Sequence, residues 1–139
     1  MPSISIKTDR KEIEIIRNGE KVGCVYFSPT DTAIFARLKD VRERLAKLEI
    51  HTPDDADADA LIEEMRRIDK EIRDAIDYAF DYPCSAVVFG SGFSFSSAGG
   101  ASEAEQFLDG AIKIIEKEMK AESSKAKARQ DKYLSRHKQ

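Results

Sequence analysis

Alternating apolar and polar residues predict β-structure over residues 1–27. Ile4 and Ile6 alternate with polar neighbours, and two further β-rich runs flank the dipeptide Asn18-Gly19. Because both residues tolerate the positive φ angles of a type I′ turn, the pattern predicts an antiparallel hairpin. A lone hairpin is marginally stable in water, so we expect it to pack on the helices that follow.

A second pattern, with apolar residues every three or four positions, predicts two helices over residues 28–80. We expect Ser28 and Thr52 to cap these helices, with Pro29 and Pro53 as the first helical residues. The apolar seams consist of Ile34, Leu38, Val41, Leu45 and Leu48 in the first helix and of Leu61, Met65, Ile68, Ile72, Ile76 and Ala79 in the second. A short connection between two seamed helices predicts an antiparallel, coiled-coil-like pair.

Residues 83–122 are predicted to form a short helix, a Gly/Ser loop and a last helix. The apolar run at residues 84–89 is interpreted as a short helix, although Val87-Val88-Phe89 also fits a strand. Ser102 and Glu105 have the spacing of a capping box at the start of the last helix. The whole of residues 1–122 is therefore predicted to be one mainly α (α+β) domain.

The apolar stripe of the last helix stops at Met119, and residues 123–139 form a basic tail. Residues 117–139 carry eight basic and three acidic side chains, a net charge of +5, whereas residues 1–116 have a net charge of −8. An acidic body with a basic tail suggests self-association or a partner that recognises charge. Alternatively, the cations complement the negative end of the helix dipole. The tail is predicted to be a fraying helix or disordered.

The composition of the 139-residue chain narrows the class of protein. Its net charge of −3 argues against a general nucleic-acid binder, and no apolar stretch is long enough to predict a membrane span. The N-terminal residues lack the pattern of a secretory signal, and the two cysteines, Cys24 and Cys84, are too few for a disulfide framework. We therefore expect a protein of the reducing cytoplasm.

Candidate sites for catalysis or cofactor binding have simpler interpretations. The glycine-rich segment at residues 90–100 has Phe95 where a dinucleotide-binding motif needs its third glycine, so we expect a flexible linker whose phenylalanines dock on the helices. His51 and His137 are too few for a metal site, and Cys24 and Cys84 are interpreted as small buried hydrophobes.

The acidic residues of the second helix are interpreted as ion-pair partners rather than as an acid/base pair. Glu63 and Arg67, and likewise Asp69 and Arg73, stand four residues apart, which favours ion pairs on one helix face. Glu64 and Glu71 are interpreted as solvated charges. We therefore expect no catalytic residue, no metal site and no cofactor, and predict that the protein is not an enzyme.

Surplus apolar surface is the most informative feature, because exposed apolar patches mark partner sites. The residues predicted to contact a partner are Phe93, Phe95, Ile112, Ile115 and Met119. The alternative is a three-helix core that uses all of this surface.

The order of these features resembles a family of small tail assembly chaperone-like proteins from siphophages and prophages of Gram-positive bacteria. The resemblance covers residues 25–139 and is carried by the helix opening at 27–32, the charged helix at 65–77, the break at 84–90 and the ending Lys132-Tyr133-Leu134.

This resemblance implies a helical holdase of the host cell cytoplasm that coats the long tape measure protein until tail tube subunits replace it. Such proteins are not enzymes, are absent from the finished virion and in several systems have a longer, frameshifted form. The implied partners are the tape measure protein or another phage tail protein, together with further copies of the same chain in a homo-oligomer. The alternatives are a structural tail protein that stays in the particle and a small helical nucleic-acid-binding or regulatory module that uses the basic tail.

Overall fold

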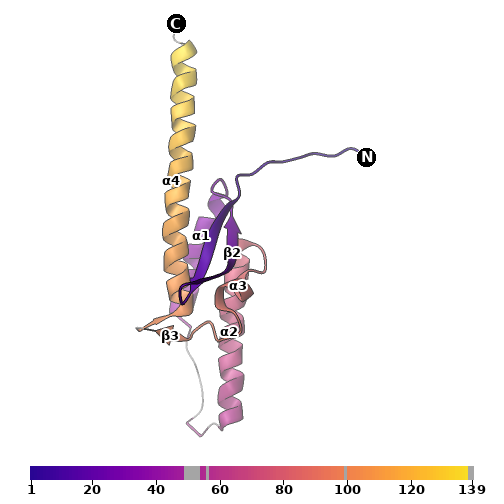
Figure 1. The fold of residues 1–139 in the computed structure, drawn as a ribbon, viewed down its shortest axis with the longest axis vertical. Helices are drawn as coiled ribbons and strands as arrows, with labels where there is room; N and C mark the ends of the chain where they lie inside the picture. The colour runs from indigo at the N-terminus through magenta and orange to yellow at the C-terminus, as the bar shows by residue number, and fades with distance from the viewer. Residues whose placement is uncertain (49–53, 56, 99, 138–139) are drawn as a thin grey trace.

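The computed structural model describes residues 1–48, 54–55, 57–98 and 100–137, and its fold is mostly helical with a hairpin near the N-terminus (Figure 1). The elements are β1 (Lys11–Arg17), β2 (Glu20–Phe27), α1 (Thr32–Ala46), α2 (Ala58–Phe80), α3 (Ser85–Phe89), β3 (Ser97–Ala98), β4 (Ala101–Ser102) and α4 (Glu103–His137). This order confirms the predicted α+β fold, with a hairpin, a helical pair, a short helix and a long C-terminal helix.

The hairpin forms around the predicted turn. Asn18 and Gly19 have φ angles of 52° and 82°, and β1 pairs with β2 in an antiparallel register. The prediction that strand begins near residue 1 was wrong, because residues 1–10 form an extended arm. Arg10 lies 3.7 Å over the Tyr26 ring, and the arm then leads away from the body (Figure 1). Ile4 and Ile6 on this arm are 90% and 83% exposed. Their alternation is a strand pattern that has no pairing partner within the described chain.

The two helices of the pair begin later than predicted. Asp31 caps α1 by accepting a hydrogen bond from the backbone N–H of Ala33 at 3.1 Å, whereas the predicted cap, Ser28, bonds to Thr30. Pro29 is buried ahead of the helix. Similarly, Asp57 caps α2 through the N–H of Ala60 at 2.8 Å. The other predicted cap, Thr52, and Pro53 lie outside the described residues.

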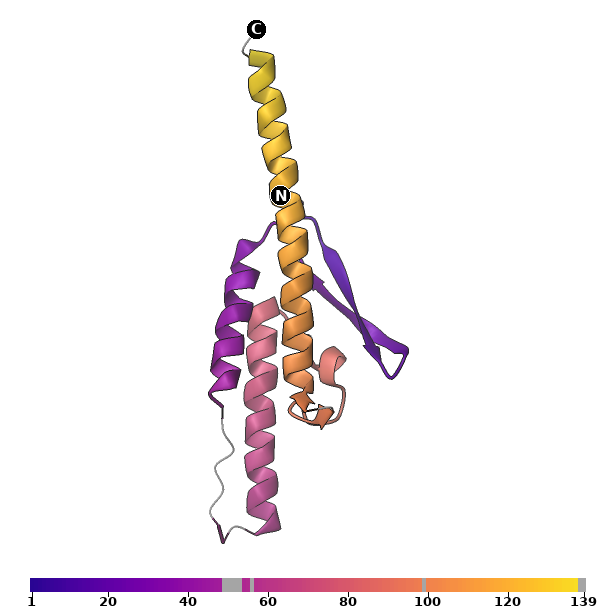
Figure 2. The same ribbon diagram turned by 90° about the vertical axis from the view of Figure 1, so that its left-hand side faces the viewer.

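One hydrophobic core draws on the hairpin and all four helices. Its most deeply buried side chains are Val25, Leu38, Val41, Ile76, Cys84, Leu108 and Ile115. Helix α1 packs against both α2 and α4, and Figure 2 shows α1 and the hairpin on opposite sides of α4. The N-terminal turns of α2 extend past the end of α1 in the same view, which explains why Leu61, predicted on the seam, is 43% exposed.

The Gly/Ser segment is tied to α2 rather than being a free linker. Asp69 accepts hydrogen bonds from the backbone N–H and the hydroxyl of Ser94, both at 2.7 Å, and Ser94 is fully buried. Arg73 donates to the carbonyl oxygens of Gly90 and Gly92 at 2.9 and 2.6 Å. The prediction of a flexible linker missed these bonds, because they come from side chains about twenty residues earlier.

The ion pairs on α2 follow the prediction only in part. The Asp69–Arg73 pair forms at 2.9 Å. Arg67, however, pairs with Glu64 and Glu71 instead of Glu63, so these two carboxylates are not the solvated charges we expected. Glu63 pairs with Arg66 instead. An arginine on a helix can reach carboxylates three residues before it and four after it, and spacing alone does not choose between them.

The short apolar run after Pro83 is helix α3, not strand. The carboxylate of Asp77 accepts hydrogen bonds from the backbone N–H groups of Cys84 and Ser85, at 2.9 and 2.8 Å, and from the Ser85 hydroxyl. Free N–H groups at a helix start need such an acceptor. Asp77, at the end of α2, therefore fixes where α3 begins.

Candidate partner-binding surfaces

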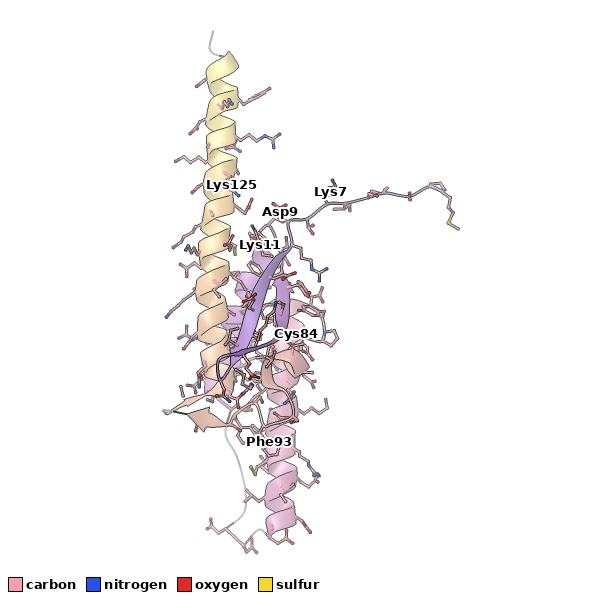
Figure 3. All side chains as sticks on the ribbon, viewed as in Figure 1. Lys7, Asp9, Lys11, Cys84, Phe93 and Lys125 are labelled. Atoms are coloured by element: carbon pink, nitrogen blue, oxygen red, sulfur yellow. The ribbon has the colours of Figure 1, made fainter. Side chains whose placement is uncertain are left out.

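The structure separates the five residues predicted to contact a partner into two groups. Ile112 and Ile115 belong to the core, with exposures of 7% and 0%, so their side chains are not on a surface that a partner can reach. Phe93, Phe95 and Met119 are half-buried and remain on the surface. The rings of Phe93 and Phe95 stack at a centroid distance of 5.1 Å, and Figure 3 shows Phe93 beside α2. A role for these side chains in binding stays a prediction.

Phe95 lines a groove at one end of the helical bundle, between α1, α2 and the start of α4. The groove has a volume of about 370 Å³. Its apolar lining comprises Leu45, Leu48, Ile68, Ile72, Phe95 and Leu108. Arg42 and Asp109 form an ion pair 3.3 Å long at its rim.

Met119 lines a second groove, between the start of α1 and the middle of α4, which we call the α1–α4 groove. It has a volume of about 580 Å³ and includes Pro29, Phe35 and Met119 among its lining residues. Charged side chains surround the apolar floor: Lys39 lies 4.9 Å above the Phe35 ring, and Lys120 pairs with Glu116 at 2.9 Å. The hydrogen bond and charge of Lys120 lower the pKa of the Glu116 carboxyl, which favours its charged form.

A third groove runs between the outer edge of β1 and α4, and we call it the β1–α4 groove. Its volume is about 530 Å³. Its lining includes Ile13, Ile15, Ile16, Phe107, Gly110 and Ile114. Ile16 and Ile114 are 55% and 42% exposed, so this groove is an open apolar surface.

Helix α4 continues beyond the body of the molecule (Figure 2). Residues 123–137, which we call the projecting helix, cover most of the predicted basic tail and are helical in the structure. Every side chain of residues 123–135 is exposed. At about 1.5 Å per residue, the projecting helix is about 22 Å long. Lys125, labelled in Figure 3, lies near its base.

One face of this helix carries a mixed apolar and basic stripe, which we call the α4 stripe. It consists of Glu122, Lys125, Ala126, Arg129, Gln130, Tyr133 and Leu134. Tyr133 and Leu134 are 62% and 55% exposed. Positions 122, 126, 129 and 133 continue the alternating three- and four-residue spacing of Ile112, Ile115 and Met119. The helix face that packs in the core therefore continues into solvent, a signal that the sequence carried but that our prediction did not use.

The two cysteines differ in burial, and burial affects how readily a thiol ionises. Burial, aided by the nearby Asp77 carboxylate, raises the pKa of the Cys84 thiol to about 12, so it stays protonated at neutral pH and is a poor nucleophile. Cys24 is half-buried and also free. Among the described residues, no group of three or more His, Cys, Asp or Glu side chains is placed to hold a metal ion. None of the helices in that part of the chain combines the length and apolar character of a membrane span.

Searches of protein-family models, of curated protein sequences and of solved structures each give no match. The resemblance to tail assembly chaperones thus rests on the sequence features described above. Its consequences for partner, location and oligomeric state remain predictions.

Proposed function

We propose that the protein binds a helical segment of another protein, and that it serves as a tail assembly chaperone for a tape measure protein. The observation that carries this proposal is the projecting helix with its exposed α4 stripe. The resemblance in sequence suggests the identity of the partner, and the exposure of the α4 stripe supports its proposed role as the binding surface.

The projecting helix gains no stability from packing on the body of the molecule in the described chain. The projecting helix continues α4 and so does not have to nucleate, but most helical stability in proteins comes from packing an amphipathic face. In the projecting helix no described residue of the body packs on that face. A second helix laid along the α4 stripe would cover the exposed side chains of Ala126 and Leu134 and add contacts that stabilise both helices.

The basic side chains of the projecting helix favour a partner helix that carries acidic side chains. Lys125 and Arg129 lie within the α4 stripe, and Lys127 and Lys132 lie close to it on the same helix. A helix with acidic side chains beside its apolar seam would form ion pairs with these cations. Such exposed pairs weaken as salt rises. We therefore expect binding to be reversible and sensitive to ionic strength.

The α1–α4 groove extends this surface onto the body. Met119 stands on the same face of α4 as Ala126, one heptad earlier, and Phe35 faces it across the groove. A partner helix that follows the α4 stripe towards the body would reach this apolar floor. Many copies, each binding weakly, would then cover a long helical chain and still be displaced during assembly.

Co-expression with a long coiled-coil tape measure protein tests the proposal. The full chain should keep the tape measure protein soluble and co-purify with it. A chain ending at Glu122 should lose both effects. If the tape measure protein precipitates equally with the full chain, the shortened chain and no added protein, the proposal is wrong.

The projecting helix also favours one other function, nucleic-acid binding, because it is basic. Affinity for DNA or RNA would fall steeply with salt and would depend on the cations alone. Tyr133→Ser with Leu134→Ser separates the two functions, since it removes apolar contacts without changing charge. This variant should weaken binding to a helix and leave nucleic-acid binding unchanged. A structural tail protein, the remaining alternative, would be detected by mass spectrometry of purified particles.

A further inference from the structure

The outer edge of β1 is an unpaired strand edge. In the described chain the backbone of β1 is hydrogen-bonded to β2 alone, while the side chain of Arg17 at its end donates to the Val88 carbonyl oxygen at 2.8 Å. On β2, the backbone N–H of Tyr26 donates to the Tyr82 hydroxyl at 2.8 Å, and α3 packs on the face of the strand so closely that a Cβ at Gly23 would lie 2.7 Å from Val87. An open strand edge presents free N–H and C=O groups and readily accepts another strand.

Beside this edge, α4 leaves room for an added strand. The β1–α4 groove has apolar walls, and Gly110 lies on its α4 side. A glycine inside a helix is about 1 kcal/mol less favourable than alanine. A Cβ at Gly110 would meet no atom within 4 Å, so nothing within the described chain requires glycine there. Its absence of a side chain deepens the groove where a strand would lie.

The chain also carries an extended segment with the residue pattern of a strand. In the arm, Ile4 and Ile6 alternate with Ser3, Ser5 and Lys7, so one side of the extended segment is apolar and the other polar. Figure 3 shows Lys7 on the part of the arm that has left the body, and Asp9 closer to the hairpin. Residues 3–7 span about 17 Å when extended, which is shorter than the seven residues of β1.

We propose that residues 3–7 of one copy of this chain add as a third strand to the open edge of β1 in a second copy, with Ile4 and Ile6 in the β1–α4 groove. Alternation then puts Lys7 on the other face, beside the exposed carboxylates of Glu12 and Glu14. Glu14 pairs with Lys21 at 3.5 Å but remains 61% exposed, so it can take a second cation.

The occupant is a second copy because the arm is poorly built to fold back on its own strand. Asp9 is the one turn-forming residue among residues 7–10, and no glycine follows it to complete a two-residue hairpin turn before β1 begins at Lys11. Exchange of an identical segment between copies is a low-cost route to association. The contact lies on the hairpin side of α4 and does not involve the α4 stripe. Failure of this proposal would therefore leave the proposed function untouched, and the reverse also holds.

Sedimentation velocity and light scattering over a range of concentrations test the proposal. The full chain should associate. Ile4→Lys with Ile6→Lys should raise the dissociation constant at least about tenfold. The matched control, Ser3→Lys with Ser5→Lys, adds the same charge to the polar side of the arm and should keep association. A monomeric full chain, or equal loss in both variants, would overturn the proposal.

Mixing two variants then tests which surfaces meet. Gly110→Leu fills the groove and should be monomeric alone, as should Ile4→Lys with Ile6→Lys. Mixed together, one variant supplies the arm and the other the open edge, so a complex of the two should form. If Gly110→Leu associates like the native chain, or the mixture stays monomeric, arm exchange is wrong. Should Gly110→Leu not give a native circular dichroism spectrum, Ile114→Lys blocks the same groove.

Discussion

Asp69 on α2 and Ser94 in the Gly/Ser segment form a buried pair in which one carboxylate oxygen accepts both the hydroxyl and the backbone N–H of the serine, each at 2.7 Å. The other oxygen of Asp69 accepts from Arg73 at 2.9 Å. Through these bonds α2 holds the segment that carries Phe93 and Phe95.

Asp69→Ala should therefore lower the free energy of unfolding by about 2–4 kcal/mol, because it leaves buried donors of Ser94 without an acceptor. Asp74→Ala is the matched control on the same helix. Asp74 pairs with Lys70 at 2.6 Å but is 63% exposed, so its loss should change stability by no more than about 0.5 kcal/mol. Chemical denaturation measures both, and similar losses in the two variants would contradict the role given to Asp69.

Two glycines should respond to alanine with opposite signs, although a Cβ at either would meet no neighbour within 4 Å. Gly110→Ala should stabilise the fold by about 1 kcal/mol, because alanine is the better helix former. Gly90→Ala should destabilise it by about 1–2 kcal/mol, because Gly90 has a φ of 63° and a ψ of −142°. Both variants should be denatured in the Ile4→Lys, Ile6→Lys background. The proposed association of copies then does not contribute to the measured free energies of unfolding.

Cys84 should make stability depend on alkaline pH. Its thiol has a pKa near 12 in the fold, against 9.0 in the unfolded chain. Between these values the unfolded chain releases a proton that the native state keeps, so stability is full below pH 9 and falls as pH rises towards 12. The loss at pH 10 should be roughly 1 kcal/mol. Cys84→Ala should show a smaller fall over the same range, and an unchanged fall would contradict this origin.

The two cysteines should differ in their reactivity towards thiol reagents, because they differ in burial. Cys84 is fully buried, whereas Cys24 is half-buried. With a thiol reagent at neutral pH, the native protein should react quickly at one thiol per chain, and Cys24→Ser should abolish that phase. The second thiol should react only on unfolding. Rapid reaction at both thiols would show that the Cys84 region opens readily.

Residues 123–139 should be dispensable for the fold. The side chains of the projecting helix do not enter the core, so ending the chain at Glu122 should change the free energy of unfolding by no more than about 0.5 kcal/mol. In hydrogen exchange, the amides of residues 123–137 should exchange faster than those around Leu108 and Ile115. Equal protection along α4 in the monomer would show that the projecting helix is supported in a way the structure does not show.

Local patterns in the sequence predicted much of this fold. Asn18-Gly19 located the hairpin turn, and Ser102 accepts from the Glu105 N–H at 3.1 Å, as the capping-box spacing predicted. The periodic apolar residues placed the helices, because a helix must bury one face. The errors at Ser28 and Pro29 arose because another capping residue, Asp31, stands closer to the first helical turn.

The surfaces were harder to predict, because exposure depends on contacts between distant elements. Ile115 and Met119 follow one another on the same stripe, yet Ile115 is fully buried and Met119 lies in an open groove. Sequence spacing cannot show where the body ends and α4 continues alone. The spacing of Ala126 and Tyr133 in the sequence continues the stripe. Because polar residues stand between them, the apolar pattern is weak there.

The most direct test of the helix-binding claim compares two alanines on the projecting helix. Ala126 lies in the α4 stripe, and Ala128 lies two residues on, on the opposite side of the helix. Ala126→Glu and Ala128→Glu change the net charge equally, so only the face differs. In a titration with the coiled-coil region of a tape measure protein, Ala126→Glu should weaken binding at least about tenfold, while Ala128→Glu should stay within about twofold of the native chain. Equal effects of the two variants, or no binding by the native chain, would contradict the account.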